Sequence, residues 1–315
     1  MFHNLKVVIV VLAVIFAQCS FASFQDGENA YKKKDYVTAL KEWRPLAEQG
    51  DASAQCKLGY MYFAGYGVVH DDEKAVKWYR KAAEQGNAQA QSSLGNMYLG
   101  GYGVQQNFEQ AVQWYRKAAD QGNEQAQFSL ANFYESGQGV VQDYVEAARW
   151  YQKSADQGNP YSQISLGQIY STGKGVAPDE AKAAKWFRKA AEYGNADAQL
   201  FLASKYANGL GVAKDYVQAA RWYRKSADQG NAIAQLNLGF NFQKGLGVVK
   251  DDAEAVRLYN MAAVQGLADA QLNLGIMYVT GQGVAKDVTI AVQWFQKSAA
   301  QGNANAQIAL HKLGY

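Results

Sequence analysis

Residues 87–122 read NAQAQSSLGNMYLGGYGVQQNFEQAVQWYRKAADQG, and this pattern recurs along the chain every 36 residues. Its closing Gln-Gly pair returns at each interval from Gln49-Gly50 to Gln301-Gly302, with Tyr193-Gly194 as the one variant. Self-similarity at a fixed period of this length is the signature of a repeat architecture. Counting from the residue after each glycine gives seven full copies: 51–86, 87–122, 123–158, 159–194, 195–230, 231–266 and 267–302. A divergent half-copy at 23–50 precedes them, and another half-copy at 303–315 follows them.

Each copy predicts two helices. In the quoted copy, Asn87 at position 1 and Asn107 at position 21 are residues whose side chains cap helix N-termini. Leu94 and Tyr98, at positions 8 and 12, have the i, i+4 spacing of one helical face. Gly101 at position 15 suits the left-handed conformation that ends a helix, and the glycine at position 36 does the same for the second. We therefore expect a first helix, helix A, after position 1 and a second, helix B, after position 21.

The expected fold class is all-α. A single hairpin cannot bury Leu94, Tyr98 and Trp114, but hairpins stacked on one another can, and such a stack is a solenoid. Gly95 lies inside helix A, where glycine costs about 1 kcal/mol relative to alanine, so we expect close helix packing there. The glycine-rich run around Gly101 does not indicate a phosphate loop, because such a loop follows a strand and ends in Gly-Lys-Ser/Thr.

The consensus N-A-x-A-Q-x-x-L-G-x-x-Y-x-x-G-x-G-V-x-x-D-x-x-x-A-x-x-W-Y-x-K-A-A-x-Q-G resembles the Sel-1-like repeat family, kin of the tetratricopeptide repeats. The half-copy 23–50 looks like a tetratricopeptide capping hairpin. The resemblance implies a right-handed α/α superhelical solenoid and a scaffold or adaptor role through protein–protein contacts. Exported bacterial members of the family are tied to host interaction, envelope assembly or peptidoglycan enzymes. A cysteine-rich branch is associated with penicillin binding, but this chain lacks those cysteines.

The N-terminus predicts export. Lys6 precedes the apolar run 7–17, which is too short to span a bilayer but typical of a signal peptide. We expect cleavage between Ala22 and Ser23, giving a periplasmic or secreted protein without a membrane span; lipoprotein processing at Cys19 is the second interpretation. Removal of residues 1–22 leaves Cys56 as the only cysteine, so no internal disulfide can form. The net charge is +3 with no basic cluster, which disfavours nucleic acid as a partner.

Candidate chemistry is sparse. Ser171-Thr172-Gly173-Lys174 fits the S-x-x-K motif of serine β-lactamases, but the S-D-N and K-T-G motifs are absent. His70 and His311 have no partners at the spacing of a zinc site or a catalytic triad. We expect no catalytic residue, metal or cofactor, and weak β-lactamase or penicillin-binding activity is the alternative. Cys56 is expected to be a small buried side chain, and the glutamine at position 5 of each copy to bond a neighbouring turn's backbone.

Variation among the copies suggests where a partner binds. Positions 3, 7, 10 and 14 of helix A vary most, and their spacing places them along one side of the helix. By resemblance to tetratricopeptide stacks, this side lines the concave groove. We expect a protein or peptide ligand there, with Asn132→Ala or Phe240→Ala weakening its capture without lowering the melting temperature. The predicted contact residues are Tyr60, Asn96, Asn132, Gln168, Phe201, Asn237, Phe240 and Asn273.

Two alternatives stay open at this point. The variable positions of helix A also fit surface sites that merely tolerate substitution. Copy 231–266 is the least regular, since Leu258, Asn260 and Met261 replace the usual Trp, Arg and Lys, and Leu267 replaces the next cap. It marks either a bend or a contact patch. A third functional interpretation, in which the chain modulates peptidoglycan enzymes, overlaps with the scaffold role.

Overall fold

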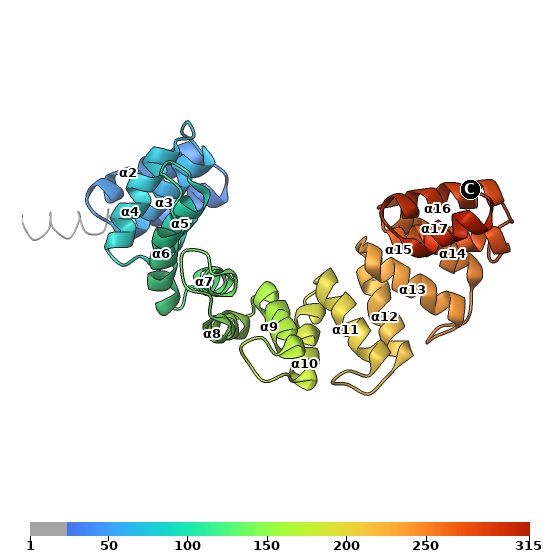
Figure 1. The fold of residues 1–315 in the computed structure, drawn as a ribbon. Coiled ribbons are helices and arrows are strands. Elements are labelled where there is room, and N and C mark those ends of the chain that lie inside the picture. Colours follow the sequence, from blue (N-terminus) through green and yellow to red (C-terminus); the bar gives the residue numbers. More distant parts are fainter. Residues whose placement is uncertain (1–23) are drawn as a thin grey trace, which may run out of the picture. The chain divides into compact units, whose positions relative to one another are not determined.

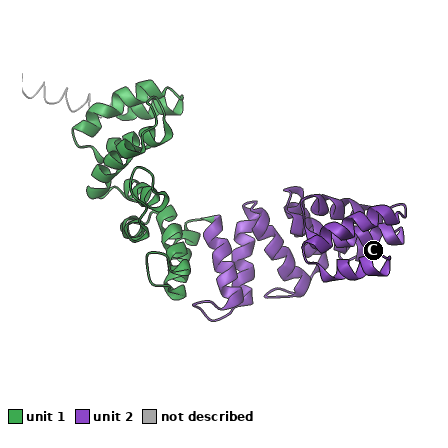
Figure 2. Ribbon diagram, turned by 45° about the horizontal axis from the view of Figure 1, so that its top comes forward, with its two compact units in different colours: residues 1–159 green, residues 160–315 purple. Residues whose placement is uncertain are grey.

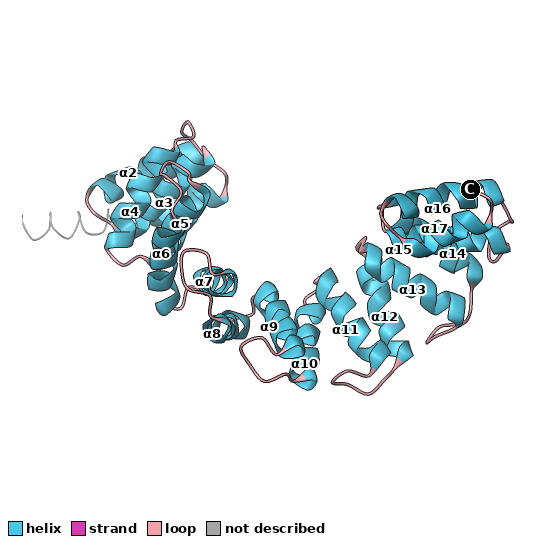
Figure 3. Cartoon of the chain, in the orientation of Figure 1, coloured by secondary structure: helices cyan, strands magenta, loops and turns pink. Residues whose placement is uncertain are grey.

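The computed structural model describes residues 24–315, and in this range all regular secondary structure is helical (Figure 3). The predicted signal peptide and its cleavage site lie outside the described residues. The chain forms two compact units, one ending at Asn159 and one beginning at Pro160 (Figure 2). None of the described helices is long and apolar enough to cross a bilayer.

Each full copy contributes two helices of 13 residues, as the sequence predicts (Figure 1). In the first unit a helix over 24–32 is followed by α2 (Tyr36–Glu48), α3 (Ala52–Ala64), α4 (Asp72–Glu84), α5 (Ala88–Gly100), α6 (Phe108–Asp120), α7 (Glu124–Ser136) and α8 (Tyr144–Asp156). The second unit contains α9 (Pro160–Thr172), α10 (Glu180–Glu192), α11 (Ala196–Asn208), α12 (Tyr216–Asp228), α13 (Ala232–Lys244), α14 (Asp252–Val264), α15 (Ala268–Thr280), α16 (Val288–Ala300) and α17 (Ala304–Lys312).

The predicted caps form. Asn87 accepts a hydrogen bond from the Ala90 amide at 2.9 Å, and Asn107 accepts one from the Gln110 amide at 2.9 Å. Gly101 ends α5 in the left-handed conformation, with φ 70°. The irregular copy 231–266 keeps both helices in register and both of its side-chain caps, at Asn231 and Asp251. The missing cap is in the next copy, where Leu267 precedes α15 without a side-chain bond.

Helices A and B of one copy approach closely because position 9 is small. A Cβ atom on Gly95 would lie 2.9 Å from the ring of the buried Tyr115 at position 29, and a Cβ on Gly167 would lie 2.5 Å from Phe187. These distances are below ordinary van der Waals contact, which explains why glycine is placed inside a helix there. The expectation of close packing at this position is confirmed.

Successive copies within a unit are joined by three recurring contacts. Gln91 donates to the Ala83 carbonyl of the preceding helix at 3.0 Å and accepts from Gln121 at 2.7 Å, which confirms the backbone role expected for position 5. Arg80 donates to the Tyr98 hydroxyl of the next copy at 2.8 Å. The loop glycine at position 17 lies on helix B of the preceding copy: a Cβ on Gly103 would sit 2.4 Å from the Asp72 backbone. Within each unit, these contacts stack the hairpins into an all-α solenoid.

Candidate binding surface

Two neighbouring hollows lie on the helix-A side of the first unit. The first, which we call the aromatic hollow, has a volume of about 520 Å³. The second, which we call the acidic hollow, has a volume of about 410 Å³. Leu99 lines both, so they share a wall. The aromatic hollow is lined by Tyr60, Phe63, Tyr79, Gln89, Ser93, Asn96, Met97, Leu99, Gly100 and Tyr102, and the acidic hollow by Leu99, Ser129, Asn132, Phe133, Glu135, Ser136 and Gln138.

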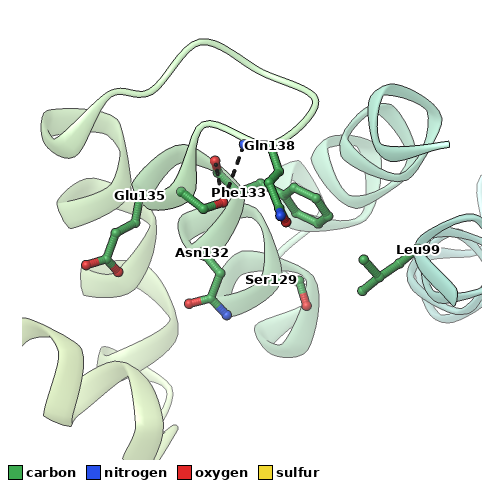
Figure 4. A pocket seen from close by; sticks show the side chains of 7 residues that line it. Leu99, Ser129, Asn132, Phe133, Glu135 and Gln138 are labelled. Atoms are coloured by element: carbon green, nitrogen blue, oxygen red, sulfur yellow. Dashed lines mark hydrogen bonds between the residues drawn. The ribbon is translucent and has the colours of Figure 1, made fainter.

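The acidic hollow opens between α5 and α7. Figure 4 shows Leu99 reaching in from α5 opposite Ser129 and Asn132 of α7, with Glu135 on the side away from Leu99. Positions 7, 10 and 13 of helix A supply Ser129, Asn132 and Glu135, because residues three apart lie on one helical face. The hollow is therefore built from the variable side of helix A.

Buried tyrosines at position 29 hold the polar residues of this face. The Tyr115 hydroxyl donates to Asn96 Oδ1 at 2.5 Å, and the Tyr151 hydroxyl lies 2.5 Å from Asn132 Oδ1 and 2.7 Å from Glu135 Oε2. Burial raises the pKa of Tyr115 above its usual range, with a hydrogen bond from Ser129 opposing the shift, so the hydroxyl stays protonated and can donate. The Asn96 oxygen is thereby occupied by the protein, which leaves its amide N–H groups as donors for a ligand.

This hydrogen bond changes one expectation. Because Asn132 bonds a buried tyrosine, Asn132→Ala removes a side-chain partner as well as a candidate contact. We expect this substitution to lower the melting temperature, unlike Phe240→Ala, whose ring is 43% exposed.

The predicted contact residues fall into three groups. In the first unit Tyr60 and Asn96 line the aromatic hollow, and Asn132 lines the acidic one. In the second unit Gln168 on α9 and Phe240 on α13 are exposed, while Asn237 and Asn273 are half-buried. Phe201 is also half-buried, and its ring packs 5.0 Å from that of Phe187, so it contributes to the core as well as to the face. The structure brings Tyr60, Asn96 and Asn132 to adjoining hollows.

Sequence comparison of the copies missed several lining residues. Phe63, Leu99 and Glu135 all occupy position 13, and Tyr102 occupies position 16. Position 13 also differs from copy to copy, as Ser171 and Val279 show, so the same criterion of variation could have found it.

Ser171 lies beside an unexpected lysine. Lys205 of α11 is buried, donates to Ser171 Oγ at 2.8 Å and pairs with Glu180 Oε2 at 2.5 Å. Ser171 Oγ in turn donates to Glu180 Oε2 at 3.3 Å. Ser171, Glu180 and Lys205 thus form one hydrogen-bonded cluster of three side chains.

The structure also places the other candidate side chains, Cys56 and His70. Cys56 is buried, and burial raises the pKa of its thiol to about 11. His70 lies in the loop before α4, with Nδ1 2.6 Å from the Phe63 carbonyl oxygen. Among residues 24–315, no three His, Cys, Asp or Glu side chains are grouped as metal ligands.

The 36-residue unit matches a known repeat along most of the chain. The sequence model of the Sel1 repeat matches seven consecutive segments, 52–87, 88–123, 124–159, 160–195, 196–231, 232–267 and 268–303. A comparison with curated proteins found no match.

Two solved structures are similar over most of the chain. One is c5321, a protective antigen present in uropathogenic Escherichia coli strains and displaying an SLR fold: it is 41% identical with a TM-score of 0.90, over 93% of this chain and 64% of that one. The other is a Sel1 repeat protein from Oxalobacter formigenes, 36% identical with a TM-score of 0.67, over 76% of this chain and 96% of that one. The chain thus spans less than two thirds of the c5321 structure. Seven repeats match the Sel1 model, and the chain is 41% identical to c5321, which displays the SLR fold. The chain therefore belongs to the Sel1 repeat family.

Proposed function

We propose that the chain is an exported scaffold that binds a protein or peptide partner along the helix-A face and catalyses no reaction. Sel1 repeat proteins generally mediate protein–protein interaction, which supports the general role. One observation carries the location: two hollows of about 520 and 410 Å³ adjoin at Leu99, and the side chains that line them differ from copy to copy. Concave sites with apolar walls and a few polar groups are where ligands bind.

The polar groups suit a peptide. Asn96 and Gln89 supply amide N–H groups that can donate to backbone carbonyls, while Tyr60, Phe63 and Tyr102 supply apolar surface for a side chain. Tyr60 is 40% exposed, Phe63 37% and Tyr102 49%. Exposed aromatic rings beside oriented donors are typical of protein-binding surfaces.

Substitution of Leu99, which lines both hollows, tests whether the partner binds there. Leu99→Arg places a long charged side chain between the two hollows and should abolish binding at both. Val141→Arg is the matched control, because Val141 is 86% exposed in a loop and lines neither hollow. The wild-type chain and both variants are immobilised, exposed to periplasmic extract or host lysate, and the retained proteins are identified by mass spectrometry.

A partner retained by the wild-type chain and by Val141→Arg but lost from Leu99→Arg supports the proposal. Equal retention by all three chains contradicts the placement on the helix-A face, and the absence of any retained partner contradicts the scaffold role. Nitrocefin turnover that disappears in Ser171→Ala would instead support the β-lactamase alternative.

A further inference from the structure

Glu135 is the one charged residue among those that line the two hollows. Every other lining residue is uncharged. At the same position of the repeat the other copies carry Phe63, Leu99, Ser171, Ala207, Gln243 and Val279. A carboxylate at this position is therefore a property of a single hollow and not of the repeat framework.

The Glu135 carboxylate is held in place but forms no ion pair with any residue in 24–315. The hydroxyl of Tyr151, a buried side chain, donates to its Oε2 atom at 2.7 Å. Among the described residues of the first unit, the ion pairs are elsewhere and join Lys57 to Glu28, Lys74 to Asp71 and Arg149 to Glu146, while His70 lies 3.2 Å from Asp72. One oxygen of Glu135 is thus fixed by the protein, and the other can accept a charged donor from a ligand.

The adjoining aromatic hollow has the opposite character. Tyr60, Phe63 and Tyr102 line it, and the rings of Phe63 and Tyr102 meet edge to face with centroids 6.0 Å apart. No lining residue there is charged, so an apolar side chain can enter it without loss of solvation for a charge.

Resting on the proposed function, we propose that the partner is a peptide segment that carries a lysine or arginine next to a bulky apolar residue. The basic side chain pairs with Glu135 in the acidic hollow, and the apolar side chain occupies the aromatic hollow. Leu99, which lines both, separates the two side chains of the ligand. Charge complementarity supplies the specificity, and the aromatic rings supply apolar contact area.

A random dodecapeptide display library, selected on the purified full-length chain, provides the probes. We expect the selected peptides to be enriched in lysine or arginine beside an aromatic, leucine or proline residue. The best peptide is then synthesised with its basic residue intact and with norleucine in that place. Affinities for the wild-type chain and for Glu135→Gln are measured by fluorescence polarisation.

Glu135→Gln should weaken binding of the basic peptide about tenfold, and the norleucine peptide should bind both chains equally. Glu109→Gln is the matched control, because it removes the same charge from an exposed position on α6 outside both hollows. In Glu135→Gln the side-chain amide oxygen can still accept from the Tyr151 hydroxyl, so an unchanged melting temperature verifies the fold.

The outcomes separate the two proposals. Peptides that bind the wild-type chain and Glu135→Gln equally, or show no basic preference, contradict the pairing with Glu135 but leave peptide binding intact. Selection of no binding peptide contradicts both the pairing and the proposed function. An equal loss of affinity in Glu109→Gln also contradicts the pairing, because it assigns the effect to overall charge.

Discussion

Gly167 shows how closely the two helices of one copy approach each other. A Cβ atom there would lie 2.5 Å from the ring of Phe187, a side chain that is almost wholly buried. Alanine gains about 1 kcal/mol of helix propensity over glycine, but overpacking a well-packed core costs about 1–3 kcal/mol. We expect Gly167→Ala to lower the melting temperature, as followed by circular dichroism.

A neighbour in the same helix provides the control. Gln168→Ala changes an exposed position of α9 and should leave the melting temperature nearly unchanged. A Gly167→Ala variant more stable than the wild-type chain would show that propensity outweighs packing. Ala131 and Ala203 occupy the equivalent position in copies 123–158 and 195–230, so a methyl group at this position occurs in the chain.

The reactivity of the Cys56 thiol reports whether its sulfur atom is buried. Burial raises the pKa of its thiol to about 11, so at pH 8 the folded protein holds almost none of the reactive thiolate. We expect iodoacetamide to leave Cys56 unmodified at pH 8 and to label it fully in denaturant, as quantified by peptide mass spectrometry. Because the folded pKa exceeds the unfolded one, this group also favours the folded state at neutral pH and loses that contribution as pH rises toward 11. Rapid labelling under native conditions would contradict the buried position.

At the scale of the helix, stacking depends on polar side chains as well as on apolar ones. Gln91 is buried on α5, donates to the Ala83 carbonyl and accepts from Gln121, so it links α4, α5 and α6. Gln91→Leu keeps the approximate volume but leaves the Gln121 amide and the carbonyl without this partner. Unsatisfied buried polar groups cost about 1–3 kcal/mol each, so we expect a clear fall in the urea midpoint.

Gln89→Leu, on the exposed side of the same helix, is the comparison for that measurement. It should change the midpoint little, since Gln89 is exposed and lines a hollow. Equal midpoints for the two variants would mean that the glutamine pairs do not join the copies.

Helix B contains a recurring contact between a lysine and a tryptophan side chain. The lysine at position 31 lies over the tryptophan at position 28, with distances to the ring between 3.8 and 4.6 Å in six copies, from Lys81 on Trp78 to Lys297 on Trp294. In copy 231–266 Leu258 and Met261 replace both members together. The joint change fits a cation–π contact, which needs both residues. A lysine that served only the helix dipole would not need a tryptophan beside it.

At the scale of the whole chain, the sequence predicted the fold better than the site. Caps, glycines and aromatic residues recur at fixed spacing, so each helix boundary could be read from Asn87, Gly101 or their equivalents, and the structure agrees. The hollows could not be predicted in the same way. They depend on which side chains of α5 and α7 face each other, as Leu99 faces Asn132, and on hydrogen bonds such as that from Tyr151 to Glu135. Spacing within one helix contains no information about such contacts between copies.

Site-specific photo-crosslinking tests the helix-A face most directly. A benzoylphenylalanine is placed at Gln89, which lines the aromatic hollow, or at Gln113, which is exposed on helix B, and each chain is irradiated with the fluorescein-labelled display peptide. If the partner lies along the helix-A face, a crosslinked product forms from position 89 and not from position 113. A product from position 113 with none from position 89 would contradict the account.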